Sequence, residues 1–266
     1  MTTNLVISYP DIPFAATEFE GDTFDSDRTL YNQINGPRYW RSKRASASTS
    51  HIFTCLLPTG TTKAVDHLII SHADLLISQG VTDIDLDSSA DNAAWTNRIA
   101  ESTFGSYSLI GRGFDYVTDI TATSAFQYWR LTYTSSSSTL ERGKAYFGTW
   151  FDFGYEPVAY DIERIPAREA VFFAGSGAKH FVRGDEPVYR FTFHYEGPTD
   201  DKIRDFYNYI VKYKHINPVF LYTRSDHTIL DNARIVHCNL VEAVTQQRTV
   251  KNDYNRLTVT YEEILG

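Results

Sequence analysis

Four aspartates that lie close together in the sequence are the first residues that could do chemistry. They are Asp83, Asp85, Asp87 and Asp91. Clustered carboxylate oxygens are the ligands that Ca²⁺ prefers. The first three alternate with Ile84 and Leu86, however, which predicts that their carboxylates line one solvent-facing side of a strand. An EF-hand loop also needs a glycine at its sixth position and a closing glutamate, and this segment has neither. We therefore expect no metal site.

Motifs of catalysis are missing from the sequence as well. It contains no glycine-rich phosphate loop, no Gly-x-Ser-x-Gly motif and no His-Glu-x-x-His motif. The short run Gly175-Ser176-Gly177 lacks the lysine of a phosphate loop and follows a strand-like segment, so it predicts a hairpin turn. A carboxylate pair for glycoside hydrolysis stays open, because its two members can be far apart in sequence. We expect a protein that is not an enzyme, with no catalytic residue and no cofactor.

Three tryptophans, Trp40, Trp95 and Trp129, could either build a core or bind a glycan by stacking. Trp40 and Trp129 both occur in a Tyr-Trp-Arg triplet, where the arginine can gain cation–π energy beside the indole. The pattern favours the core for all three, most strongly for Trp129, whose segment alternates faces. Trp95 is the best candidate for an exposed platform, because a loop-like stretch precedes it. We group it with Asp91 and Asn92 as the candidate glycan-binding residues.

The elements that must position these residues are mostly strands. Aromatic residues make up 15% of the chain, and such residues favour half-buried pleated surfaces. Short apolar segments alternate with loops rich in Ser, Thr, Asn, Asp and Gly. The predicted strands in the first half are His51–Leu57, His67–Ile70, Thr82–Leu86 and Tyr128–Tyr133. In the second half, residues 190–196 alternate with period two. We expect an all-β, mainly antiparallel fold.

The sequence predicts one long helix, at Thr199–Lys214. It begins after Pro198 with acidic residues in its first turn, where they complement the helix dipole. Apolar residues then recur at spacings of three and four. Phe206, Ile210 and Tyr213 should therefore pack on a sheet.

Charge and cysteine usage limit the partners. The formal net charge is −8 and no basic run occurs, so the sequence indicates no basic surface that would bind the phosphates of a nucleic acid. No segment has the apolar length of a membrane span. The N-terminus lacks the basic-then-apolar layout of a signal peptide, so we expect folding in a cytosol. Cys55 and Cys238 are therefore expected to be buried free thiols.

Four segments, in order, resemble the discoidin family, whose fold is a galactose-binding-like jelly-roll sandwich. They are Trp40-Arg41-Ser42, Asp66 to Ser71, Asp85 to Trp95, and Phe126 to Leu131. The family's Asp-Gly turn is replaced here by Ala90-Asp91-Asn92, and the terminal cysteine pair of extracellular members is absent. The resemblance implies a jelly-roll domain over residues 26–150, preceded by a loop-like arm over residues 1–25.

The second half, residues 151–266, resembles the ring-forming β-domain of phage distal tail and baseplate hub proteins. The resemblance rests on the order of the strands, the helix, Phe220-Leu221-Tyr222 and a closing strand at Leu257–Glu263. It implies a β-barrel-like domain that carries one helix and joins identical copies in a ring.

Together the two resemblances imply a structural component of a bacteriophage tail tip, assembled in the host cytoplasm and carried in the virion. Its partners would be identical subunits in the ring, the tail tube, hub and tape-measure proteins, and a host surface glycan bound by the first domain. Two alternatives stay open: a free-standing carbohydrate-binding lectin, and a glycan hydrolase with a binding domain.

Overall fold

The computed structural model describes residues 5–8, 18–21, 42–43, 49–101, 115–120, 124–136, 140–165, 168–173, 177–182, 188–212, 219–223, 235–241, 245–249 and 254–263. The chain divides into two compact units. The sandwich unit consists of Val6–Phe151 and Phe220–Val236, with Gly266. The helix unit consists of Met1–Leu5, Asp152–Val219 and His237–Leu265. Trp40 lies outside the described residues, so its predicted role stays a prediction.

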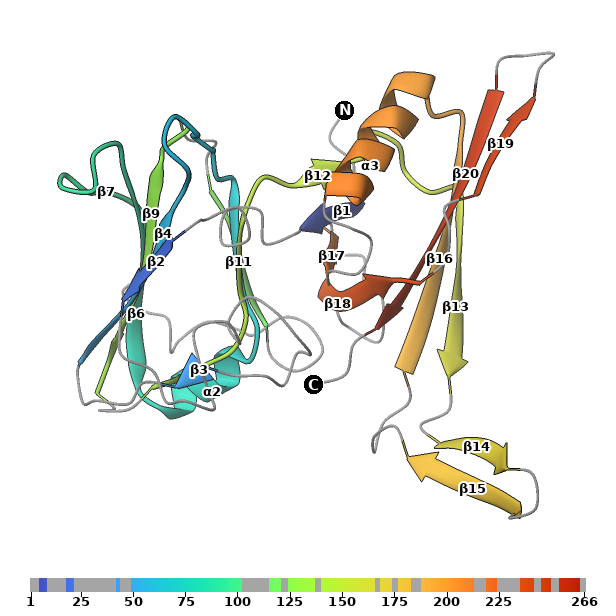
Figure 1. Ribbon diagram of the computed structural model, residues 1–266, viewed down its shortest axis with the longest axis horizontal. Helices are drawn as coiled ribbons and strands as arrows, with labels where there is room; N and C mark the ends of the chain where they lie inside the picture. The colour runs from blue at the N-terminus through green and yellow to red at the C-terminus, as the bar shows by residue number, and fades with distance from the viewer. Residues whose placement is uncertain are drawn as a thin grey trace. The chain divides into compact units, whose positions relative to one another are not determined.

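Two facing sheets form the sandwich unit (Figure 1). The five-stranded sheet has the order β2 (Glu18–Gly21), β4 (Ser50–Leu56), β9 (Tyr128–Ser135), β6 (Val81–Ser89) and β7 (Thr96–Glu101). The three-stranded sheet has the order β11 (Ala145–Gly148), β5 (His67–Ile70) and β8 (Tyr116–Asp119). A short pair joins β10 (Glu141–Arg142) to β3 (Ser42–Lys43), and the helix α2 (Ala73–Ser78) lies between β5 and β6 in the chain. All strand pairs with a recorded register are antiparallel in this unit.

The core of the sandwich unit lies between the two sheets. Strand β9 alternates in burial, so Trp129 and Leu131 point inward without exposed surface, while Arg130 points outward. The prediction that Trp129 is a core residue is confirmed. Because Trp and Leu side chains each bury a large apolar area, this alternation fixes the register of β9 against its neighbours.

Strand β5 is buried on both of its faces. Leu68 and Ile70 belong to the core between the sheets, whereas Ile69 packs with Trp150 and Ile235 on the outer side of the three-stranded sheet. This explains why His67–Ile70 reads as a continuous apolar run rather than an alternating one.

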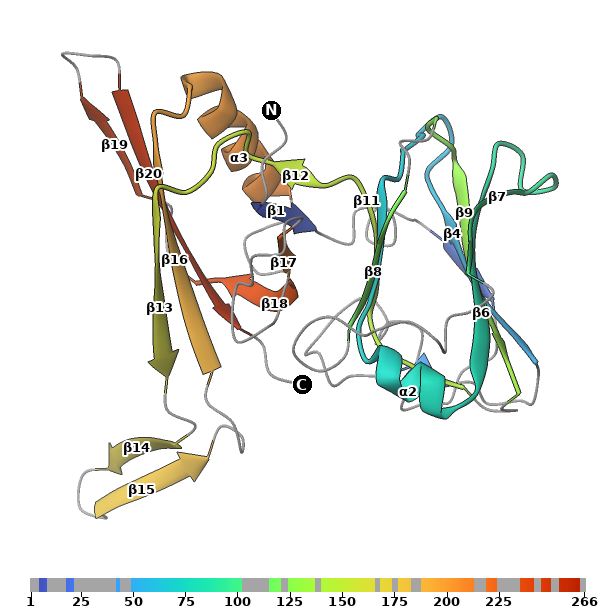
Figure 2. The same cartoon turned by 180° about the vertical axis from the view of Figure 1, so that it is seen from behind.

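An open antiparallel sheet and one long helix make up the helix unit. The pairings run from β18 (Ile235–Leu240) through β20 (Tyr254–Glu263) and β16 (Val188–Glu196) to β13 (Ala159–Ile165), and β19 (Thr245–Thr249) also pairs with β20. A hairpin of β14 (Arg168–Phe173) and β15 (Gly177–Val182) continues from β13 (Figure 2). Strands β12 (Phe151–Asp152), β1 (Leu5–Ser8) and β17 (Val219–Thr223) are hydrogen-bonded in that order, and most residues of β1 and β17 belong to the sandwich unit.

The helix α3 (Asp200–Lys212) confirms the long helix predicted from the sequence. Phe206 is 2% exposed, and its ring lies 5.6 Å from that of Phe153, which in turn contacts Tyr195 of β16 at 4.5 Å. Ile203 is buried as well. Neither the side chain of Ile210 nor any part of Tyr213 is described, so their predicted packing stays a prediction.

Three further expectations can be compared with the structure. The mainly antiparallel β fold is confirmed, but the described strands of the helix unit form an open sheet rather than a closed barrel. The arm over residues 1–25 was expected to be loop-like, and this was wrong, because β1 and β2 lie within it. Cys55 and Cys238 are buried free thiols, as predicted.

Candidate functional site

The hairpin loop between β6 and β7 spans residues 90–95, and the carboxylate of Asp91 holds it in shape. Oδ1 of Asp91 accepts hydrogen bonds from the backbone N–H groups of Ala93 and Ala94, each at 2.9 Å, and from the Ser89 hydroxyl at 3.0 Å. These bonds hold the pKa of the Asp91 carboxyl below its usual value, the N–H of Ala94 contributing most. Asp91 therefore has a structural role in the loop in addition to its predicted role in binding.

Asn92 occupies the tip of this loop with a φ of 60°. This is the left-handed region, which asparagine tolerates better than most residues because its short polar side chain bonds locally. Asn92 is partly exposed. Asn92 thus adopts the left-handed conformation that glycine takes in the Asp-Gly turn of the discoidin family.

Trp95 follows the loop and is half-buried, with a guanidinium lying over its ring. Cζ of Arg130 is 4.2 Å from the centroid of the Trp95 ring. Arg130 also donates from Nε and Nη2 to Oδ2 of Asp87, at 3.1 and 2.8 Å. The ion pair holds the guanidinium, and the cation–π contact in turn orients the indole.

These groups lie on the outer face of the five-stranded sheet. The strand register places Asp87 of β6 between Arg130 of β9 and Asn97 of β7. The side-chain amide of Asn97 donates to Asp85 at 2.9 Å. Tyr128 shares the face with Arg130, because the two are separated by one residue in β9 and side chains alternate along a strand. We refer to Trp95, Arg130, Asp87, Asn97 and Tyr128 as the Trp95 site.

Asp87 corrects one expectation from the sequence. The alternation of aspartates with Ile84 and Leu86 predicted that Asp83, Asp85 and Asp87 face solvent, yet Asp87 is 7% exposed. Its position is in the middle of the sheet, where the long side chain of Arg130 covers it and neutralises it. Periodicity identifies the outer face of a strand, but it does not reveal a neighbouring arginine that covers part of that face.

The Trp95 site offers a partly exposed aromatic ring beside fixed polar groups. Within the part of the chain that the structure describes, Nη1 of Arg130 and Oδ1 of Asp87 make no hydrogen bond. A donor and an acceptor therefore remain available next to the indole. Rings combined with a few fixed polar groups suit ligands that have both C–H surfaces and hydroxyl groups.

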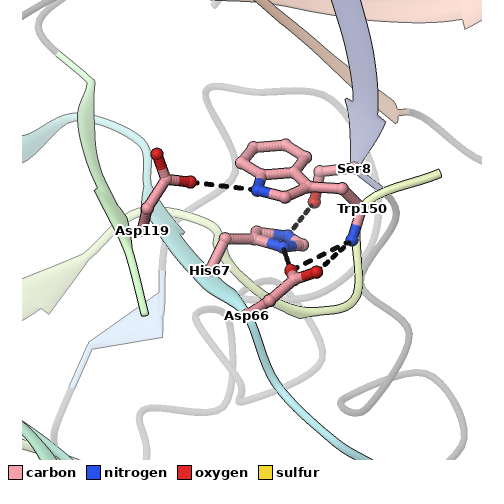
Figure 3. Close-up of polar contacts among 5 residues, drawn as sticks. All are labelled: Ser8, Asp66, His67, Asp119 and Trp150. Carbon is pink, nitrogen blue, oxygen red and sulfur yellow. Dashed lines mark hydrogen bonds and ion pairs between the residues drawn. The ribbon is translucent and has the colours of Figure 1, made fainter. Parts of the chain in front are cut away.

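A second arrangement, in the sandwich unit, has the hydrogen-bond pattern of a Ser-His-Asp triad (Figure 3). Oγ of Ser8 in β1 is 2.5 Å from Nε2 of His67 in β5, and Nδ1 of His67 is 2.8 Å from Oδ1 of Asp66. With Nδ1 donating to Asp66, Nε2 of neutral His67 accepts a hydrogen bond from the Ser8 hydroxyl. No motif indicates this cluster, because its serine is distant in the chain and Asp66-His67 is recognisable only as the beginning of a strand.

Burial decides what this cluster can do. Ser8 and His67 have no exposed surface. Trp150 stacks on the His67 ring with a centroid separation of 3.7 Å and donates from its indole to Asp119 at 3.0 Å. Its backbone N–H also donates to both oxygens of Asp66, at 3.1 and 3.3 Å (Figure 3). A nucleophile must be reached by its substrate, so in this arrangement the cluster ties β1 to β5 as a buried polar network.

Among the described residues, no group of three or more His, Cys, Asp or Glu side chains could hold a metal ion. None of the described helices combines the length and the apolar character that crossing a membrane requires.

No protein-family model matches the sequence, and no curated protein matches it. Among solved structures, the chain is similar to chitosan-binding module 1 of a chitosanase/glucanase from Paenibacillus sp. IK-5, with 14% identity and a TM-score of 0.40 over 52% of this chain and 98% of the module. It is also similar to module 2 of that enzyme, solved with chitotriose, with 13% identity and a TM-score of 0.40 over 52% and 99% of the two chains. A CBM32 module from Clostridium perfringens, in complex with GalNAc-β-1,3-galactose, has 10% identity and a TM-score of 0.41 over 52% of this chain and 99% of the module. These three solved structures are carbohydrate-binding modules, and the chain is also similar to part of a GH29 fucosidase from Ruminococcus gnavus, with 12% identity and a TM-score of 0.40 over 50% of this chain and 25% of the enzyme.

Proposed function

We propose that this protein binds a glycan at the Trp95 site, on the outer face of the five-stranded sheet. The observation that carries the proposal is the half-buried indole of Trp95, oriented by Arg130 and bordered by the polar row of Asp87 and Asn97. A sugar ring would stack on the exposed part of the indole. Its hydroxyl groups would bond Nη1 of Arg130 and Oδ1 of Asp87.

The proposal uses residues that the sequence identified and residues that it did not. Trp95 was predicted as the platform and lies in the site. Asp91 and Asn92 shape the loop that leads into Trp95. Arg130 and Asp87 were not predicted, because their neighbourhood depends on the pairing of β6 with β9.

The test is a glycan array probed with the full-length protein, followed by calorimetry on the best oligosaccharide. Trp95→Ala should weaken binding roughly 10-fold or more, which is about 1.4 kcal/mol, because it removes the stacking surface. Trp95→Phe keeps an aromatic ring and should retain part of the affinity. Arg130→Ala should weaken binding to a similar extent as Trp95→Ala.

Arg190→Ala is the matched control. Arg190 has the same exposure as Arg130, 30% against 29%, and likewise pairs with carboxylates across a sheet, but it belongs to the helix unit. It should leave glycan binding unchanged. An array that stays blank with the parent protein, or equal losses in the two arginine variants, would overturn the proposal.

A structural role at a phage tail tip stays a prediction from the sequence, together with its ring of identical subunits and its tail partners. It does not compete with glycan binding, because a tail-tip protein can carry a binding domain. Mass spectrometry of purified phage particles is its direct test. The hydrolase alternative would need a pair of carboxylates or an exposed nucleophile.

A further inference from the structure

Three exposed apolar side chains occupy alternate positions at the start of β13, the strand at the edge of the helix unit's sheet. Val158, Tyr160 and Ile162 are 59%, 51% and 40% exposed. In the described part of the chain, Val241 is the one other large apolar residue that is as exposed. A single exposed apolar side chain is ordinary, but a row of them on one strand marks an interaction surface.

This row lies on the core-facing side of the sheet. The register pairs Tyr160 with Phe193 and Ile162 with Phe191, and both phenylalanines are buried. The rings of Tyr160 and Phe193 have centroids 6.1 Å apart. The row therefore extends the apolar face of the helix unit to the edge of its sheet, where it meets solvent.

The opposite face of β13 is polar and already paired. Asp161 bonds His194 at 3.1 Å, and Glu163 bonds Arg190 at 3.2 Å. Among the described strands, β13 pairs with β16 alone, so its outer edge offers backbone N–H and C=O groups (Figure 1). An open edge with an apolar face is a template for another strand.

We propose that β13 pairs with β13 of a second copy of this chain, antiparallel and about a two-fold axis at Tyr160. In this register Tyr160 opposes its own copy, Val158 opposes Ile162, and Ala159 opposes Asp161. All three exposed apolar side chains then contact apolar partners, and no like charges oppose each other. The pairing ends naturally at Pro157, which has no N–H to donate.

Opposed side chains in a continuous antiparallel sheet point to the same face, so the two-fold axis must pass through one residue and its own copy. Among the possible central residues, charge favours Tyr160. Centring the axis on Ile162 would oppose Asp161 and Glu163, and centring it on Asp161 would oppose two copies of that aspartate. Like charges directly opposite are destabilising. Centring it on Ala159 would place Ile162 opposite Glu156. These charge restrictions arise because β13 pairs with its own sequence; a strand of another sequence would not face them.

Cross-linking tests the register directly in the full-length protein. Opposed residues in antiparallel strands have Cα atoms about 4.5–5.5 Å apart, which a disulfide can span. Tyr160→Cys should therefore form a covalent dimer under mild oxidation. Glu163→Cys, on the same exposed strand, would lie far from its own copy in this register and should stay monomeric. Cys55 and Cys238 are buried and should give no background.

Sedimentation velocity provides a second measurement that needs no cysteine. The contact is short, so we expect a weak dimer that forms at roughly micromolar to hundred-micromolar concentration. Ile162→Lys should abolish it while leaving the melting temperature unchanged, because Ile162 is exposed in the monomer. Val241→Lys, an equally exposed position, is the control and should dimerise like the parent. A parent protein that stays monomeric at these concentrations, a larger closed ring, or equal cross-linking of the two cysteine variants would overturn the proposal.

Discussion

Lys144 is a lysine without exposed surface in the sandwich unit. Its backbone exchanges hydrogen bonds with Ser71, which hold the segment against the end of β5. Burial lowers the pKa of Lys144 from its ordinary value to about 7, because the charged ammonium loses its hydration. The folded protein therefore binds this proton less tightly than the unfolded chain does.

The sign of the pH dependence follows from this lowered pKa. Above pH 7 the unfolded chain keeps a proton that folded Lys144 has released, so stability should rise with pH. Between pH 7 and 8.5 the gain should be about 1–2 kcal/mol. Above about pH 8.5 the unfolded thiols of Cys55 and Cys238 ionise, while burial raises the pKa of both thiols in the folded protein, which opposes the trend.

Urea unfolding at pH 7.0 to 8.5 measures this effect. Lys144→Met keeps much of the side-chain volume and has no proton to lose, so its stability should change less with pH than that of the parent. Parallel slopes in the two proteins would show that Lys144 does not cause the trend.

Single residues differed in how far the sequence could predict them. Trp129 was predictable as core, because strand alternation alone decides its side. For Trp95 the platform role stays a prediction; its partner Arg130 could not be predicted, because the contact depends on which strands pair. Ser8 and His67 could not be paired at all, since 59 positions separate them and burial, rather than a motif, brings them together.

At the scale of elements, α3 gives the sharpest prediction. Phe206→Asp should lower the free energy of unfolding by about 3–5 kcal/mol, because it buries an unpaired carboxylate against Phe153. Asn208→Asp adds the same charge on the exposed side of the helix and should have little effect. Thermal melts of the two variants make the comparison, and similar melting temperatures would mean that α3 is not docked through Phe206.

Long elements with a clear period were predictable, and short ones were not. The sequence predicted α3, because its apolar residues recur over more than three turns and acidic residues mark its start. It missed α2, which has six residues and whose N-cap residue, His72, makes no side-chain capping hydrogen bond. Period-two alternation located β16 and β20, whereas the strands within the first 25 residues are four residues long and carry too little pattern to recognise.

At the scale of the whole molecule, the sandwich unit is discontinuous in sequence. The segment over residues 26–150, which the resemblance to the discoidin family marks as one domain, lacks Ser8, β2 and Ile235. His67 would lose its hydrogen bond to Ser8 while keeping the one to Asp66, and Ile69 and Trp150 would lose their contact with Ile235.

A polypeptide of residues 26–150 should therefore be less stable than the same unit in the full chain. It should bind a hydrophobic dye and show a red-shifted tryptophan emission. Ile235→Ala in the full chain reproduces one part of the loss and should cost about 2–5 kcal/mol. If the fragment melts cooperatively at the temperature of the full-length protein, residues outside 26–150 are not needed to complete the unit.

Because residues of the helix unit separate the two segments of the sandwich unit, the sandwich unit cannot be completed until late in translation. β5 and β11 emerge from the ribosome early, yet Ile235, which covers the outer side of their sheet, is made many residues later. At ~5–20 residues per second, the nascent chain waits roughly 4–17 s before that cover exists. During this interval Ile69 and Trp150 present apolar surface outside the tunnel, so the protein is a natural client for chaperones that bind nascent chains.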